Sequence, residues 1–261
     1  MTPPEGIKKR EQLIRDGYCV LDNILTEDFL EELRGESDRL LDAVEHPPKW
    51  QYQGSDLHIN GKDNSIIQKL IDWQPTRDAM HTLGLTDFKS HGGFILLSKP
   101  ANGPPLYWHQ DWMNWNDPIS LAPWPQVLFF SYYMVDTTLE NGCFRIIPGT
   151  HKKRIPLHDQ VEIAHQETAY FADVNDPVMF GDHPGTIDVP AEAGSLVIGE
   201  GRVLHAARAN KSNNRRTLLL GWHARPNTTP DYWREEVPEP IVKRPKNKVY
   251  EGTRVPGKYL I

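Results

Sequence analysis

The chain is poor in cysteine and has no long apolar run. Cys19 and Cys143 are its only cysteines, which excludes a disulfide framework, and no C-x-x-C motif is present. No run approaches the roughly 18 apolar residues that a membrane-spanning helix needs. The N-terminal stretch MTPPEGIKKREQLIRDGY also lacks the apolar core of a signal peptide. These absences predict a soluble, cytoplasmic protein with no membrane partner.

Clustered positive charge is absent too. A net charge of −6 is spread along the chain without a basic stripe, so we expect no nucleic-acid partner. Proline and glycine are abundant instead, at 22 and 19 residues, which favours many turns over long helices. With 38% hydrophobic residues, the chain can bury a core and is expected to be globular. No feature predicts its oligomeric state.

The helical signals lie in the first third of the chain. Ile7–Asp16 alternates charged and apolar residues like a short helix, and a strand is expected at Tyr18–Asp22. Leu25–Glu45 has apolar residues at helical spacing and a suitable N-cap in Thr26. A weaker helix is expected at Gln74–Leu83.

From residue 92 onward, short β-branched or aromatic runs alternate with Gly, Pro and Asn clusters, a pattern typical of strands. We expect strands within Gly92–Pro100, Pro105–Trp112, Gln126–Asp136, Cys143–Gly149, Gly194–Glu200, Arg202–Ala209 and Arg216–Ala224. The pattern predicts a mostly β fold, a sandwich or barrel, with an α-helical N-terminal layer. The polar range 150–190 is expected to form a loop or lid. The Pro-rich range 226–261 is expected to wrap the surface or serve a partner.

The stretch PPLYWHQDWMNW places His109 and Asp111 two positions apart among aromatic side chains. On a strand, these two positions point to the same face. A buried carboxylate without a partner is costly, and a cation between the two side chains would offset that cost. An imidazole and a carboxylate supply two ligands of the 2-His-1-carboxylate triad of ferrous iron. The pattern therefore predicts an iron site that needs one more histidine.

His205 is the best candidate for that third ligand. It lies in RVLHAARA, which is followed by the turn signal NKSNN and the strand-like RTLLLGWHA. In a hairpin centred between Asn210 and Lys211, Arg216 would lie opposite His205 and share its face. A guanidinium beside the metal suits a dicarboxylate cosubstrate that chelates the iron.

Other histidines compete with His205. His165 repeats the H-x-acid pattern but lies in the polar range 150–190, where no strand is expected. His223 lies on a late strand, yet no arginine faces it across a turn. Together with Asp173 and His183, His165 is expected to face either a polar substrate or solvent.

Several motifs resemble the phytanoyl-CoA dioxygenase family. They are WHQDW, TLENGCFRIIPGTHK and AGSLVIGEGRVLHAARANKSNNRRT, in this order and at family-like spacing, and the opening IRDGYCVLDNILTEDFLEELR is also similar. The resemblance covers about residues 14–224. It implies an iron(II)- and 2-oxoglutarate-dependent dioxygenase with a double-stranded β-helix (jelly-roll, cupin-like) core. The whole range 1–261 is then expected to be one oxygenase domain.

The resemblance also assigns residues. By position, His109, Asp111 and His205 match the metal ligands, and Arg216 matches the arginine that holds the far carboxylate of 2-oxoglutarate. Many relatives have a small polar residue two places after the distal histidine, where this chain has Ala207.

A missing hydrogen bond at Ala207 would have to come from elsewhere, and Tyr107 and Ser131 are the candidates. Trp112, Asn114 and Trp115 follow the aspartate and are expected to line the substrate site. The segment ENGCFRIIPGTHK is expected to be mainly structural.

The implied reaction converts 2-oxoglutarate and O2 to succinate and CO2 while a small-molecule substrate is hydroxylated or otherwise oxidised. Relatives that halogenate replace the carboxylate by a small residue, so Asp111 argues against halogenation. The family accepts acyl thioesters, amino-acid derivatives, alkaloids and terpenoids. Because no basic cluster is present to bind CoA phosphates, an acyl-CoA substrate is disfavoured.

Two alternatives stay open from the sequence. A cupin-like metalloenzyme could use the same core without 2-oxoglutarate, and it would have no need of Arg216. A non-enzymatic β-sandwich binding module would explain the eight tryptophans as aromatic platforms, and it would need no metal.

Overall fold

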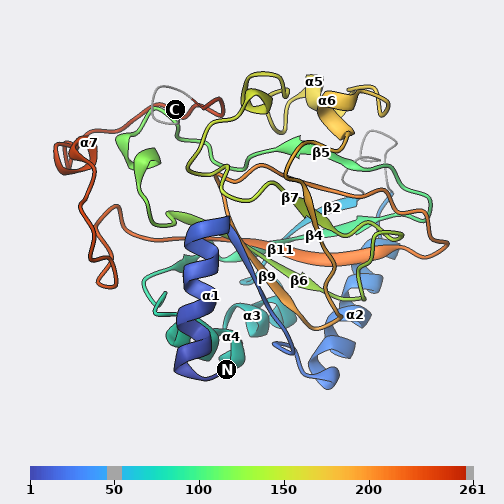
Figure 1. Ribbon diagram of the computed structural model, residues 1–261. Helices are drawn as coiled ribbons and strands as arrows, with labels where there is room; N and C mark the ends of the chain where they lie inside the picture. The colour runs from blue at the N-terminus through green and yellow to red at the C-terminus, as the bar shows by residue number, and fades with distance from the viewer. Residues whose placement is uncertain (46–54, 257–261) are drawn as a thin grey trace.

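The computed structural model describes residues 1–45 and 55–256, and four helices fill most of its first part (Figure 1). They are α1 (Pro3–Asp16), α2 (Glu27–Asp42), α3 (Ser65–Ile71) and α4 (Gln74–Leu83). The helices predicted near Ile7–Asp16, Leu25–Glu45 and Gln74–Leu83 are confirmed, whereas α3 was not predicted. As expected, the Thr26 hydroxyl caps α2 by accepting the N–H of Phe29 at 3.4 Å.

The strands form two antiparallel sheets. The seven-stranded sheet has the order β1-β9-β6-β11-β4-β2, with β3 also paired to β11. Its strands are β1 (Tyr18–Leu21), β2 (Ser55–Asn60), β3 (Lys89–Ser90), β4 (Gly93–Lys99), β6 (Val127–Tyr133), β9 (Leu196–Glu200) and β11 (Arg216–Ala224). The four-stranded sheet has the order β5-β10-β7-β8. Its strands are β5 (Leu106–His109), β7 (Phe144–Ile146), β8 (Ile187–Val189) and β10 (His205–Ala207).

Each face of the seven-stranded sheet buries apolar side chains. One face shares a hydrophobic core with α1 to α4, where Phe29 and Leu33 of α2 join Phe130 and Leu219 of the sheet. In Figure 1 these helices lie below the sheet and the four-stranded sheet lies above it. Residues of both sheets, including Phe129 and Phe144, meet in a second core. The two sheets therefore face each other across this second core.

The predicted hairpin between the strands of His205 and Arg216 is wrong. His205 lies opposite His109 of β5 and Ile146 of β7, whereas Arg216 begins β11 and lies opposite Lys99 of β4. The physical reason is that β10 already has a neighbour on each edge, so no edge is free for β11. The connecting residues 208–215 instead cross from one sheet to the other.

The range 150–190 is only partly a loop. It contains a 3-10 helix η3 (Pro156–Asp159), the helices α5 (Glu167–Tyr170) and α6 (Pro177–Phe180), and strand β8. Buried Met179 and Phe180 of α6 pack against Tyr107 of β5, which explains the difference from the expectation. The indole N–H of Trp108 also donates to the carbonyl of Gly181 at 2.8 Å. Apolar anchors thus fix much of this range to the four-stranded sheet.

Part of the described tail packs against residues 114–117. Arg244, which follows α7 (Glu239–Val242), forms two hydrogen bonds of 2.6 and 2.5 Å to the carboxylate of Asp117. The N–H of Trp115 donates to the carbonyl of Thr253 at 3.1 Å. Within the described residues, no helix has the length and apolar character needed to cross a membrane.

Candidate metal centre

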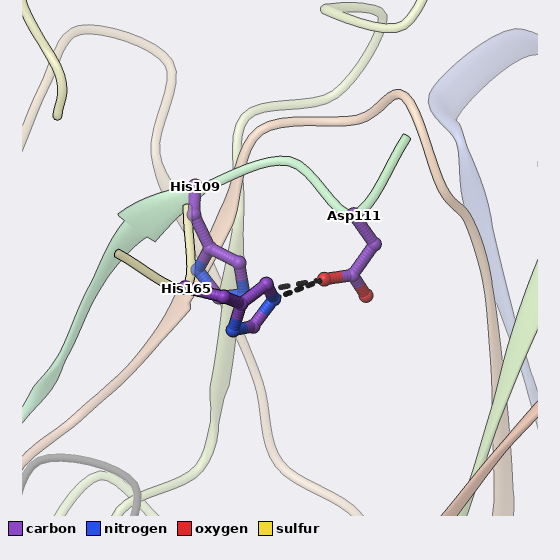
Figure 2. Close-up of side chains that lie close together, drawn as sticks. All are labelled: His109, Asp111 and His165. Atoms are coloured by element: carbon purple, nitrogen blue, oxygen red, sulfur yellow. Dashed lines mark hydrogen bonds and ion pairs between the residues drawn. The ribbon is translucent and has the colours of Figure 1, made fainter. Parts of the chain in front are cut away.

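The Asp111 carboxylate lies among three imidazoles. Its Oδ1 is 3.6 Å from Nε2 of His109 and 3.2 Å from Nε2 of His165, and its Oδ2 is 3.7 Å from Nε2 of His205. Figure 2 shows His109 and His165 beside Asp111. The rings of His109 and His205 are 4.2 Å apart between centroids. Ligand atoms of His109, Asp111 and His165 all lie within 4.8 Å of one another, and His205 joins this group through Oδ2 of Asp111.

Backbone carbonyls orient two of the three histidines in the same way. Nδ1 of His109 lies 2.9 Å from the carbonyl oxygen of Tyr107, and Nδ1 of His205 lies 3.0 Å from that of Val203. Because a carbonyl can only accept, each Nδ1 carries the proton and each Nε2 keeps its lone pair. This is the arrangement usual for histidines that bind a metal through Nε2.

The protonation states also suit a metal ion. Burial lowers the pKa of His109 to about 3 and lowers the pKa of His205, so both rings are neutral at pH 7. Burial acts to raise the pKa of Asp111, but the hydrogen bond from His165 and the nearby imidazoles outweigh it, and the pKa lies below its usual value. A charged carboxylate and two neutral imidazoles form the donor set that a divalent metal requires.

The Asp111 side chain is positioned by the chain on either side of it. Strand β5 ends at His109, so the expectation that both residues lie on one strand is wrong for Asp111. The Gln110 amide donates to the carbonyl of Arg202, and the N–H of Trp112 donates to the carbonyl of Gly201 at 2.8 Å. Because of these two contacts, the chain after His109 no longer pairs with β10, and the Asp111 side chain lies toward His205.

A buried ion pair between Arg202 and Glu200 lies next to these two contacts. The Arg202 guanidinium forms hydrogen bonds of 2.9 and 3.0 Å to the carboxylate of Glu200, and both side chains are almost fully buried. Arg202 also donates to three carbonyls in and after the 3-10 helix η2 (Pro118–Leu121), those of Ser120, Ala122 and Trp124. The ion pair therefore ties β9, η2 and the segment that carries Asp111 into one unit.

A cavity of about 710 Å³ extends from the imidazoles to Arg216. The Arg216 side chain is 6% exposed, its Nε has no hydrogen-bond partner, and no carboxylate within the described ranges pairs with it. Lys99, opposite Arg216 on β4, also lines the cavity, and burial together with the charge of Arg216 holds its pKa well below the usual value. A buried guanidinium and a buried amine at one end of the cavity are complementary to a carboxylate ligand.

The other expected site residues divide into two groups. Ser131, Trp112 and Asn114 line the cavity. Tyr107 and Trp115 are fully buried, and neither is among the residues that line it. Tyr107 packs beneath the range 150–190, where its hydroxyl accepts the N–H of His165 at 3.2 Å, so it supports the site from behind.

His165, Lys99 and Arg254 also line the cavity. The sequence patterns had not placed any of the three among the expected ligands of the metal or cosubstrate. The H-x-acid pattern had marked His165, but the polar range around it gave no reason to place it beside Asp111. Lys99 had a usable signal, since it is the charged residue of an otherwise apolar strand, GGFILLSKP. Arg254 lies in the tail and carried no such signal.

The geometry defines a class of protein, one with a cluster of histidines and an aspartate that could hold a metal ion, beside a cavity with a buried arginine between two antiparallel sheets. The family model for phytanoyl-CoA dioxygenase matches residues 13–218, most of the chain, and the protein belongs to this family.

Relatives with assigned names match at low identity. The chain is similar to the probable alpha-ketoglutarate-dependent hypophosphite dioxygenase of Stutzerimonas stutzeri, with 27% identity over 199 residues, 74% of this chain and 61% of that protein. It is similar to the ectoine dioxygenase of Nocardia farcinica, with 21% identity over 87% of this chain and 80% of that protein. Among solved structures, the non-heme alpha ketoglutarate dependent epimerase SnoN from nogalamycin biosynthesis aligns with a TM-score of 0.61. That alignment has 17% identity and covers 98% of this chain and 97% of SnoN, so it shows a shared fold.

Proposed function

We propose that this protein is a non-haem iron(II)- and 2-oxoglutarate-dependent dioxygenase. It hydroxylates, or otherwise oxidises, a small-molecule metabolite and releases succinate and CO2. The observation that carries the proposal is that one cavity holds both the His-Asp-His cluster and a buried arginine, Arg216, which has no carboxylate partner in the described part of the chain. A cupin-like enzyme without 2-oxoglutarate has no use for such an arginine.

The architecture is part of the same proposal. The two sheets form a double-stranded β-helix core, and α1 to α4 form an N-terminal helical layer on it. The range 1–261 acts as a single cytoplasmic oxygenase domain. The shared core between the helices and the seven-stranded sheet supports this division.

His109, Asp111 and His205 are the residues that would hold iron. Two facing strands supply the histidines, and carbonyl groups fix both rings with Nε2 toward Asp111. When bound, iron supplies the activation of O2 that is coupled to decarboxylation of 2-oxoglutarate. The aromatic rings of Phe129 and Phe144 lie 4.9 and 5.7 Å from that of His205 between centroids and give this side of the site an apolar wall.

Arg216 would bind the far carboxylate of 2-oxoglutarate, with Lys99 beside it. Burial lowers the pKa of both side chains, and a doubly negative ligand would favour their charged forms. Ala207 lines the cavity and offers no hydroxyl, and Ser131, which also lines it, is the candidate for that hydrogen bond.

The substrate would enter where residues of three segments meet. Trp112 and Asn114 follow the metal ligands, Tyr170 comes from α5, and Arg254 comes from the tail. The named relatives are dioxygenases of ectoine and hypophosphite, which supports a small polar substrate for this chain as well.

The test is an anaerobic titration of the metal-free protein with iron(II) and then 2-oxoglutarate, with the visible charge-transfer band as readout. Wild type is expected to develop the band. Arg216→Ala is expected to weaken 2-oxoglutarate binding about 10- to 100-fold, the loss typical of a charge-assisted hydrogen bond of about 1.5–3 kcal/mol. Arg215→Ala is the matched control, because Arg215 pairs with Asp38 and Asp42 on the surface and should leave the titration unchanged.

Equal 2-oxoglutarate affinity in the two variants would contradict the role of Arg216. Iron binding without any charge-transfer band in wild type would favour the cupin-like alternative. A protein that binds no iron would exclude both readings of the site.

A further inference from the structure

A third histidine reaches the metal site from outside both sheets. His165 belongs to the range 150–190 and lies just before α5. Its Nε2 is 3.2 Å from Oδ1 of Asp111, and its ring lies edge-on to that of His109 at 5.4 Å between centroids (Figure 2). Its side chain is 24% exposed, against 3% for His109 and 8% for His205.

The backbone of His165 is held in an unusual conformation. Its φ is +62°, in the left-handed region that residues other than glycine seldom adopt. The hydroxyl of Tyr107 accepts its N–H at 3.2 Å, and Arg254 donates to the carbonyl of the preceding residue, Ala164, at 3.1 Å. A residue keeps such a conformation where surrounding contacts hold it there. Here Tyr107 of β5 and Arg254 of the tail hold it from two sides.

The tail is fixed on each side of Arg254. Before it, the carbonyl of Thr253 accepts the N–H of Trp115 at 3.1 Å. After it, the carbonyl of Pro256 accepts a hydrogen bond of 2.9 Å from Arg154, which lies in the range 150–190. The tail therefore clamps the range 150–190 at two points, one of them next to His165.

We propose that His165 is a positioning residue of the metal centre, which donates from Nε2 to Oδ1 of Asp111 and fixes the rotation of that carboxylate between His109 and His205. The role rests on the proposed function in one respect, that Asp111 is a metal ligand. A nitrogen that carries this proton has no lone pair for a metal, so His165 acts through Asp111. Partners of this kind typically change metal affinity 10- to 100-fold when they are removed.

Two substitutions separate the side chain from the backbone. His165→Asn keeps a residue that tolerates a positive φ, but its amide is too short to reach Asp111. His165→Gln places an amide nitrogen near the former position of Nε2 and can donate to the same oxygen. The matched control is His183→Asn, because His183 lies in the same range, donates to the carbonyl of Val178 at 2.9 Å and does not line the cavity.

The measurements are the iron(II) dissociation constant, from anaerobic competition with a chromophoric chelator, and the visible spectrum of the cobalt(II)-substituted protein. We expect His165→Asn to weaken iron binding about 10- to 100-fold. His165→Gln should recover most of the affinity, and the control should match wild type. The cobalt(II) spectrum should stay that of wild type in all variants, because no ligand is lost.

Each other outcome overturns the role. Unchanged iron affinity in His165→Asn would show that the contact with Asp111 does no positioning, and an altered cobalt(II) spectrum would show that His165 is itself a ligand. If the Asn variant does not fold, Tyr107→Phe provides the second test, since it removes only the acceptor of the His165 N–H and should weaken iron binding in the same direction. Wild type that binds no iron would instead refute the proposed function itself.

Discussion

Asp111 keeps its negative charge although its side chain is 5% exposed. The imidazoles of His109 and His205 are neutral, so the full countercharge arrives only with a metal ion. In the metal-free protein the hydrogen bond from His165, with the nearby imidazoles, holds the pKa of this carboxyl below its usual value, so the charged form is favoured more in the folded protein than in the unfolded chain.

The substitution Asp111→Asn tests what the charge of this one residue contributes to metal binding and to stability. The amide has the same shape but no charge, so we expect iron binding and the charge-transfer band to be lost. The melting temperature of the metal-free protein should fall at neutral pH, because the folded state favours the charged form of Asp111 and the variant loses that contribution. A melting temperature equal to or above that of wild type, measured by circular dichroism without metal, would mean that the charge of Asp111 does not stabilise the metal-free fold.

Much of the candidate site could be predicted residue by residue. The pair His109 and Asp111 was visible from its spacing, and His205 and Arg216 from their strand-like surroundings. The predicted pairing was wrong, because His205 and Arg216 belong to different sheets and do not face each other across one hairpin. His165 was missed as a site residue because its position depends on packing of the range 150–190, which local sequence does not encode.

At the scale of elements, the ion pair between Glu200 and Arg202 joins the end of β9 to the segment that holds Asp111. Both side chains are almost fully buried, and Arg202 also donates hydrogen bonds to three backbone carbonyls. Breaking a buried pair by removing one partner leaves an uncompensated charge and is strongly destabilising.

Arg202→Met should therefore lower the free energy of unfolding by about 3–5 kcal/mol, whereas the double variant Glu200→Gln/Arg202→Met should recover part of that loss. Urea unfolding of the metal-free protein measures both. Arg215→Met serves as the surface control, with an expected change of about 0–1 kcal/mol. If Arg202→Met is as stable as the Arg215→Met control, Arg202 is not needed to hold this part of the fold.

The elements themselves were mostly predictable where their pattern was long. The amphipathic helix α2 and the apolar strands β4, β6, β9 and β11 fall within their predicted ranges. The elements α3, β2, β3 and β8 were not predicted, since each is short or carries a mixed polar pattern. Sheet membership could not be read from sequence either, because it depends on which strand edges are already occupied.

At the scale of the whole molecule, the cavity lies between the two sheets, so a ligand that fills it should stabilise the folded state. Binding at a concentration about 100 times the dissociation constant contributes about 2.7 kcal/mol. For a chain of this size, that corresponds to a rise in melting temperature of about 5–10 °C.

Thermal melts without metal, with iron(II), and with iron(II) plus 2-oxoglutarate under nitrogen provide the measurement. We expect two successive increases in wild type. Arg216→Ala should retain the first increase and lose most of the second, and a chelator should reverse both. Melting temperatures that do not respond to iron(II) would argue against a metal site in the cavity.

The clamp formed by the tail has a consequence for how the protein is made. Both sheets are complete once Ala224 has emerged from the ribosome, and with them the strands that carry His109, His205 and Arg216. Arg254 and Pro256, which bind the range 150–190 at Ala164 and Arg154, are synthesised after these strands. The strands that carry the metal ligands can therefore pair before the tail is present to fix the range 150–190 at Ala164 and Arg154.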